Sequence, residues 1–295
     1  MNKLIRFGSA FLLIGLALVL VVSTTTNANI FVLDDENFTL NEEDYSKDDF
    51  DSFYFDLDNR SVYIEESEDD QIHLKYYTHE KDLVDYEDTE NEVNLTITRK
   101  WYYNIFSFNV FSDKDYYKVY LSLPADLVID MLEVSTSNGR VESDVDNVFS
   151  TVRLISSNGR MDIANLSANN ILVSTSNGDI DLNDVLVSGS ADLDTSNGDI
   201  LINNLAANEI DADTSNGRID AQDITSENIA FDSSNGRVYL LVLGKKEDYR
   251  VTLSTSNGSE IYDGIKVDSG TINSSGSKTI SLDSSNGDVE VSFTD

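Results

Sequence analysis

Residues 174–180 read Ser-Thr-Ser-Asn-Gly-Asp-Ile, and residues 194–200 repeat them almost unchanged as Asp-Thr-Ser-Asn-Gly-Asp-Ile. The tripeptide Ser-Asn-Gly at their centre occurs eight times in the chain. Successive asparagines are 20, 19, 20, 19, 19, 22 and 29 residues apart, and a period of this length indicates stacked repeats. The repeated pairs are Asn138, Gly139, Asn158, Gly159, Asn177, Gly178, Asn197, Gly198, Asn216, Gly217, Asn235, Gly236, Asn257, Gly258, Asn286 and Gly287.

Apolar residues stand at fixed offsets from these tripeptides and alternate with polar ones, as in β-strands. Since one coil cannot bury its apolar face alone, stacked coils about 4.8 Å apart explain the pattern. The predicted fold class is all-β, a single-chain β-solenoid with coils of 19–20 residues. The position four residues before each asparagine holds Val134, Leu154, Val173, Leu193, Ala212, Phe231, Leu253 and Leu282.

Each Ser-Asn-Gly is predicted to form a sharp corner between two strands. Asn-Gly favours positive φ angles, which glycine adopts without steric cost. The Thr or Ser two residues before each asparagine, and the asparagine itself, are expected to face the interior as stacked hydrogen-bonding ladders. We therefore expect a structural role for the corners, since no histidine stands nearby to activate a serine.

One column of the predicted stack is acidic. Asp194, Asp213 and Asp232 each lie three residues before an asparagine, so they would stack about 4.8 Å apart and repel one another. A bound calcium ion is one hypothesis, and an outward, solvated row is the other. No other cofactor is predicted.

The composition excludes several classes of function. Against 20 Lys+Arg there are 54 Asp+Glu, a formal net charge of −34, which argues against binding nucleic acid. The chain has no cysteine, so disulfides, thiolate nucleophiles and cysteine zinc sites are ruled out.

The N-terminal segment, residues 1–28, predicts a membrane anchor. Lys3 and Arg6 precede an apolar run from Phe7 to Val22, and counted from Leu4 a segment of 19 residues is available, just enough to span a bilayer as a transmembrane helix. The positive residues before the run place the N-terminus in the cytoplasm and the bulk of the chain outside a cell membrane crossed once. The alternative is a signal peptide, cleaved to release a secreted protein.

After the anchor we expect an acidic linker over residues 29–49, a strand region capping the solenoid over 50–133, and the repeat solenoid over 134–295. Trp101, Tyr102 and Tyr103 belong to an aromatic-rich stretch of the cap. They could form an exposed apolar surface that binds a partner, or they could fill the core between strands. The last coil is expected to leave a bare sheet edge at Phe293 and Thr294.

The repeated units at residues 174–180 and 194–200 resemble the bacterial "putative adhesin" β-strand-repeat family, a domain of unknown function related to toast-rack domains. The resemblance covers about residues 50–295, including the strand that ends in Leu-Ser-Leu-Pro before the first repeat. It implies an extracytoplasmic β-solenoid of the cell envelope, often tethered to the membrane, and brings no catalytic residues.

We therefore expect a membrane-anchored, non-catalytic surface protein, either an adhesin-like module or a cell-envelope scaffold. Its partner would be a cell-envelope polymer or a membrane protein. One alternative is the sensory ectodomain of an envelope-stress system, which would need a membrane partner because the cytoplasmic stub is short. A second is a β-helix enzyme acting on polysaccharide, with the aspartate column as its acids.

Overall fold

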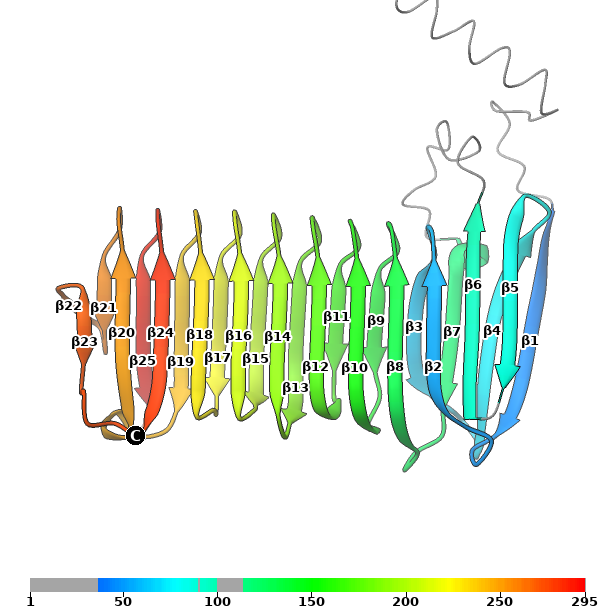
Figure 1. Cartoon of the computed structure of the whole chain (residues 1–295), viewed down its shortest axis with the longest axis horizontal. Coiled ribbons are helices and arrows are strands. Elements are labelled where there is room, and N and C mark those ends of the chain that lie inside the picture. The colour runs from blue at the N-terminus through cyan, green and yellow to red at the C-terminus, as the bar shows by residue number, and fades with distance from the viewer. Residues whose placement is uncertain (1–36, 90, 100–113, 295) are drawn as a thin grey trace, which may run out of the picture.

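A computed structural model describes residues 37–89, 91–99 and 114–294 of the chain. Their strands form a flattened solenoid with two layers that lie face to face, here called the front sheet and the back sheet (Figure 1). A short strand pairing joins the two layers, so the hydrogen-bonded network is continuous. The front sheet contains, in spatial order, β5 (Asp82–Thr89), β6 (Asn91–Arg99), β2 (Phe50–Leu57), β8 (Val128–Thr136), β10 (Val148–Ser156), β12 (Ser167–Thr175), β14 (Ser190–Thr195), β16 (Glu209–Thr214), β18 (Asn228–Ser233), β24 (Lys278–Ser284), β20 (Tyr249–Thr255) and β23 (Gly270–Ile272).

The back sheet follows the same axis and supplies the second strand of each coil. Two short 3-10 helices, Asp115–Tyr117 and Lys246–Asp248, lead into strands. In spatial order the back strands are β1 (Phe38–Ser46), β4 (Gln71–His79), β7 (Lys118–Leu123), β3 (Ser61–Glu66), β9 (Val141–Asp144), β11 (Met161–Ala164), β13 (Ile180–Val187), β15 (Ile200–Ala206), β17 (Ile219–Ile224), β19 (Val238–Leu243), β25 (Val289–Thr294), β21 (Glu260–Tyr262) and β22 (Ile265–Val267).

The all-β repeat fold predicted from the sequence is confirmed. Alternate residues of both sheets point inward and form one apolar core. Residues at equivalent offsets lie side by side in neighbouring coils, for example Ile171 beside Ala191 and Ala191 beside Ile210. Each coil thus covers the apolar row of the next, which is why an isolated coil would not be stable.

The predicted division into linker, cap and repeats needs two corrections. Residues 38–46, assigned to an acidic linker, form β1, which pairs with β4 in antiparallel register. In β1 the side chains of Leu40, Glu42 and Asp44 are exposed and alternate with less exposed residues that face the cap. This alternation is that of a strand, although the segment is acidic. The boundary at residues 133 and 134 is not a break, because one core cluster runs through both sides of it.

Both ends of the solenoid place coils out of chain order. The coil of β2 and β3 lies between the coil of β6 and β7 and that of β8 and β9. At the other end, β24 and β25 lie between the coil of β18 and β19 and that of β20 and β21. The long spacing of 29 between the last two asparagines reflects this reversal.

The expectation of a bare edge at the C-terminal strand is therefore wrong. Phe293 and Thr294 belong to β25, which pairs with β19 on one side and β21 on the other. The outermost coil is instead covered by two short antiparallel strands, β22 on β21 and β23 on β20. Short, oppositely directed edge strands of this kind limit edge-to-edge association.

Within the described ranges, no helix has the length and apolar composition needed to cross a membrane. The predicted anchor, residues 1–28, lies outside the described residues.

Candidate functional site

The corner asparagines form a continuous ladder along one ridge of the solenoid. Each side-chain Nδ2 donates to the Oδ1 of the asparagine in the preceding coil, over 2.6–3.0 Å. The ladder begins at Asn59, which accepts from Asn138, and passes from Asn235 to Asn286 before Asn257. These asparagines lie on the outer surface, so the expectation that they face the interior is wrong.

The hydroxyl residue two positions before each asparagine lies inside the corner and is buried in every coil except that of Thr255, which is partly exposed. Thr195 Oγ1 accepts from the backbone N–H of Gly198, at 3.2 Å, and donates to the carbonyl of Gly178 in the preceding coil, at 3.0 Å. Buried backbone groups need such partners. The same hydroxyl position is occupied by Thr136, Ser156, Thr175, Thr214, Ser233, Thr255 and Ser284.

The corner glycines serve a different purpose from the one predicted. None of the Asn-Gly corner residues has a positive φ angle. A Cβ atom on any of these glycines would lie only 1.6–2.1 Å from a carbonyl oxygen of the preceding coil. Glycine is required because the backbones approach so closely, a use distinct from its freedom in φ. Left-handed residues occur instead at the opposite bend, at Asn165, Asp184, Asn204 and Asp223.

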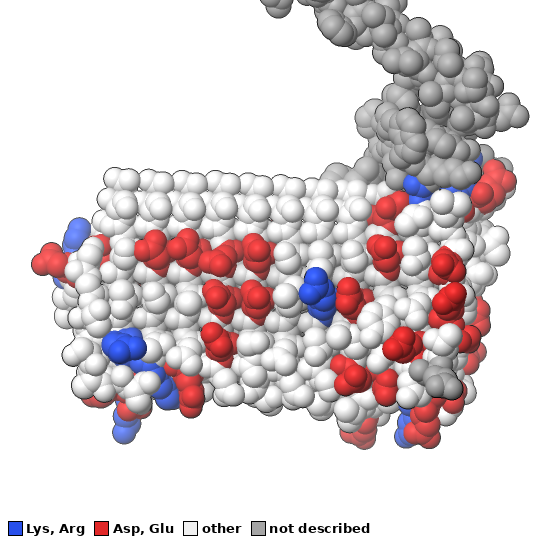
Figure 2. All heavy atoms as spheres, in the orientation of Figure 1, with Lys and Arg blue, Asp and Glu red and all other residues white. Residues whose placement is uncertain are grey.

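The aspartate column lies on the outer surface of the front sheet. Asp194, Asp213, Asp232 and Asp283 are in register on neighbouring strands. Figure 2 shows acidic side chains gathered in rows on this face. Partial burial, followed by the charges of Asp211, Asp232 and Asp194, raises the pKa of Asp213 to about 6.

The column does not have the arrangement of a metal site. In the part of the chain that the structure describes, no group of three or more His, Cys, Asp or Glu side chains is placed to hold a metal ion. The carboxylates point outward from a flat sheet and do not converge on one point, as calcium ligands must. Trp101, Tyr102 and Tyr103, the predicted aromatic patch, lie outside the described residues.

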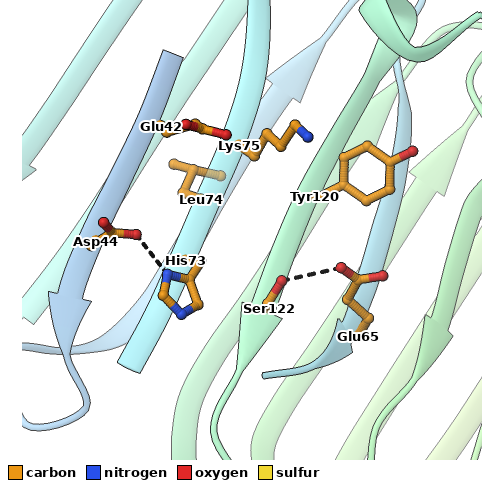
Figure 3. A pocket seen from close by; sticks show the side chains of 8 residues that line it. All are labelled: Glu42, Asp44, Glu65, His73, Leu74, Lys75, Tyr120 and Ser122. Atoms are coloured by element: carbon orange, nitrogen blue, oxygen red, sulfur yellow. Dashed lines mark hydrogen bonds and ion pairs between the residues drawn. The ribbon is translucent and has the colours of Figure 1, made fainter. Parts of the chain in front are cut away.

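The N-terminal cap carries a pocket of about 370 Å³ on the outer surface of the back sheet. Figure 3 shows its side chains, which come from β1, β4, β7 and β3; all but that of Leu74, which faces the core, belong to the outer surface of the sheet. The cross-strand register brings Glu42 beside Lys75, Lys75 beside Tyr120, and His73 beside Ser122. The pocket is lined by Glu42, Asp44, Glu65, His73, Leu74, Lys75, Tyr120 and Ser122.

His73 links two acidic side chains at the rim of this cap pocket. Its Nδ1 lies 2.6 Å from Asp44 and its Nε2 lies 2.9 Å from Asp69. The hydrogen bond to Asp44, and then that to Asp69, raises the pKa of His73 above its usual value. Protonated His73 therefore fastens the edge strand β1 to β4 and to the turn that precedes it.

One aromatic ring, that of Tyr120, lines the cap pocket, and the ring of Tyr63 lies against it. Tyr63 and Tyr120 stack with ring centroids 5.3 Å apart. The Lys75 ammonium lies 5.8 Å from the centre of the Tyr120 ring and that of Lys118 lies 5.3 Å from Tyr63. Such cation–π contacts hold the rings in place and present a partly exposed aromatic surface.

A second concavity, which we call the back-sheet groove, has a volume of about 290 Å³ and crosses β13, β15 and β17. Two rows of outward side chains line it, with Leu182 and Ile202 below them. One row holds Asp181, Leu201 and Asp220, and the other holds Asn183, Asn203 and Gln222.

The two histidines are already hydrogen-bonded to other groups of the protein. Of the histidines, His73 bonds to aspartates and His79 accepts from a backbone N–H, so within the described residues neither meets a serine or threonine hydroxyl as a base would. Sequence reasoning missed both concavities because their residues meet only through strand register. Asn183 and Asn203 follow their corner asparagines at the same distance in the sequence, and this equal spacing could have indicated that they form a row.

Comparison with known proteins gives a family. Residues 50–292 match the family model described as Toastrack DUF4097. No curated protein matches the chain.

Several solved structures are similar in arrangement. A "putative adhesin" from Bacteroides fragilis NCTC 9343 is 17% identical, with 86% of this chain and 97% of that chain covered and a TM-score of 0.49. A "putative adhesin" from Parabacteroides merdae ATCC 43184 is 14% identical, with 88% and 98% covered and a TM-score of 0.46. A "putative lipid binding protein" from Parabacteroides distasonis ATCC 8503 has the same identity and coverage, with a TM-score of 0.45.

The family model spans well over half of the chain, including all eight Ser-Asn-Gly corners, and agrees with the resemblance seen in the repeats. This chain therefore belongs to the Toastrack DUF4097 family.

Proposed function

We propose that this chain is a non-catalytic binding protein of the cell envelope, anchored by its N-terminal segment with the solenoid outside the cell. The observation that supports a binding role is the outer surface of the back sheet. There, strand register aligns polar side chains in straight rows and hollows the surface in two places. A rigid stack with repeated side chains is suited to long or repetitive partners.

The charge of the chain supports the same proposal. A net charge of −34 keeps such a protein soluble and disfavours its adsorption to anionic lipid or nucleic acid. The binding partner would be a polymer of the envelope. The structures with "adhesin" in their names are consistent with this class but are too distant to specify a partner.

The location can be tested by labelling single cysteines in intact cells. Because the chain has no cysteine, Ser196→Cys at an exposed corner introduces one reactive thiol. A membrane-impermeant maleimide should label this variant in intact cells. The matched control is Leu193→Cys, whose side chain is buried and should react only after denaturation. Labelling of Ser196→Cys only after lysis would contradict the proposed topology.

Binding can be tested by sedimenting the full chain with purified cell-envelope polymers. Saturable co-sedimentation supports the binding role. The absence of binding to every polymer fraction, together with co-purification of a membrane protein, would favour a sensory ectodomain instead.

A further inference from the structure

We infer that the back-sheet groove is a binding site for a neutral polysaccharide, whose chain lies along the solenoid axis and across the strands. This inference rests on the proposed function, because it assigns a site and a ligand class to the binding of an envelope polymer.

The groove is built from two parallel rows that continue from coil to coil. In the first row, Asp181 pairs with Leu201, Leu201 with Asp220, and Asp220 with Tyr239 of β19. The half-exposed Leu201 and Tyr239 therefore alternate with carboxylates along one line. This alternation suits an extended sugar chain, because each pyranose ring has an apolar C–H face and an edge of hydroxyl groups.

The second row contains two amides, those of Asn183 and Asn203, that the protein itself does not use. Within the described residues, the exposed side chains of Asn183 and Asn203 make no hydrogen bond, although strand register places them side by side. At the corners, asparagines in the same relation bond to one another at 2.6–3.0 Å. Asn183 and Asn203 thus keep both donors and acceptors available for a ligand.

The charges of the groove favour a neutral ligand. Asp181 forms an ion pair with Arg160, which also pairs with Asp162. Asp220 accepts a hydrogen bond from Gln222 at 3.2 Å. Gln222 carries no charge, so Asp220 keeps its negative charge and the groove repels a polyanion. Asp220 can also accept hydrogen bonds from sugar hydroxyl groups, whereas Asp181 is buried and its carboxylate is paired with Arg160.

The geometry also fits a polymer of sugars. Coils repeat at about 4.8 Å, close to the length of one pyranose unit in an extended chain. Successive sugars would therefore meet successive coils, with Leu201 below one of them. Two coils further on, one face of the Tyr239 ring is covered by the Arg237 guanidinium, 4.8 Å from its centre, so a sugar would meet the rest of that ring. A polysaccharide bound in this way would make several weak contacts at once, so its affinity for the groove should increase with the number of sugar units.

Affinity electrophoresis of the full chain tests the ligand class. Two polymers with the same β-1,4-linked backbone serve as probes: hydroxyethyl cellulose, which is neutral, and carboxymethyl cellulose, which is anionic. We expect retardation by the neutral polymer and none by the anionic one. Retardation by carboxymethyl cellulose as strong as that by hydroxyethyl cellulose would overturn the assignment of a neutral ligand.

Variants with a matched control test the site. Leu201→Ala and Asn203→Ala should each weaken retardation by about five- to tenfold, the loss of one contact of roughly 1 kcal/mol. Leu172→Ala is the control, because Leu172 is equally half-exposed but lies on the front sheet. Tyr239→Ala is a second, independent variant, and thermal melting checks that each variant folds.

The results separate this inference from the proposed function. If the groove variants bind hydroxyethyl cellulose as the parent does, the groove assignment is wrong. If the full chain sediments with envelope polymers but no neutral polysaccharide retards it, the ligand class is wrong and the binding role remains. If it binds no polymer at all, both proposals fail.

Discussion

Substituting Gly198 by alanine tests whether close backbone contact holds the solenoid together. A Cβ at this position would lie 1.8 Å from the carbonyl oxygen of Gly178 and 2.9 Å from the backbone nitrogen of Asp179. Since ordinary contacts of this kind are at least 3.4 Å, the two coils must separate by more than about 1 Å in a tightly packed stack.

The cost can be worked out from the bonds across that corner. Separation breaks the bond from Thr195 to the Gly178 carbonyl, at 3.0 Å, and that from Asn197 to Asn177, at 2.8 Å. Two bonds of about 1 kcal/mol each and overpacking strain of about 1–3 kcal/mol give a loss of about 3–5 kcal/mol. That is a large part of the stability of an ordinary domain.

Urea denaturation followed by circular dichroism would measure this loss in the full chain, and hydrogen exchange in β14 and β15 would locate it. Ser196→Ala, in the same corner but exposed, should change stability by less than about 0.5 kcal/mol. The sign of the change in the free energy of unfolding distinguishes the two possibilities. Without the close contact, Gly198→Ala at a non-positive φ should stabilise the protein by about 0.4–1 kcal/mol, and a neutral or stabilising result would refute the reasoning.

Three further perturbations have definite expected outcomes. Asn197→Ala removes three inter-coil hydrogen bonds and should cost about 1–3 kcal/mol in thermal denaturation, whereas a cost near zero would mean that water replaces these bonds fully. The pKa of Asp213 is raised to about 6 in the folded state, so folding favours its protonated form. The destabilisation caused by its charged form is therefore absent near the pKa of an unfolded aspartate and grows as the pH rises to about 6. Asp213→Asn should thus raise the melting temperature at about pH 8 but not at about pH 4, and equal effects at both would contradict this sign. The pKa of His73 is raised in the folded state. The stabilisation that protonated His73 gives the fold is therefore complete below its pKa in the unfolded chain and is lost as the pH rises through its pKa in the folded state. His73→Asn should accordingly expose β1 to proteolysis at about pH 6, and an effect that persists unchanged at about pH 9 would exclude the charge of His73 as the cause.

The repeat period and the two-residue alternation were enough to predict the solenoid, because both reflect local covalent geometry. Columns such as Val173, Leu193 and Ala212 follow directly from side chains that alternate across a strand. The same reasoning failed for β1, whose acidic residues suggested a linker. There, pairing with β4 stabilises a strand that composition alone disfavours.

The aspartate column could be placed from the repeat, but its chemistry could not. Register put Asp194 beside Asp213 as expected, whereas the outward direction and the flat surface that prevent convergence on a metal depend on the sheet as a whole. The cap pocket lay beyond prediction for another reason. Its residues come from strands whose spatial order differs from their order in the chain.

The sequence by itself determined the fold class, the coil length and the identity of the corners, since a repeat of 19–20 residues repeats the same local physics in each coil. Only the tertiary structure decided why the corners need glycine, which side the asparagines face, and which coil closes the stack. Those features depend on contacts between coils, such as the approach of Gly198 to Gly178 and the insertion of β24 and β25 before β20 and β21. The physical reason is that local propensity acts along the chain, whereas packing acts across it.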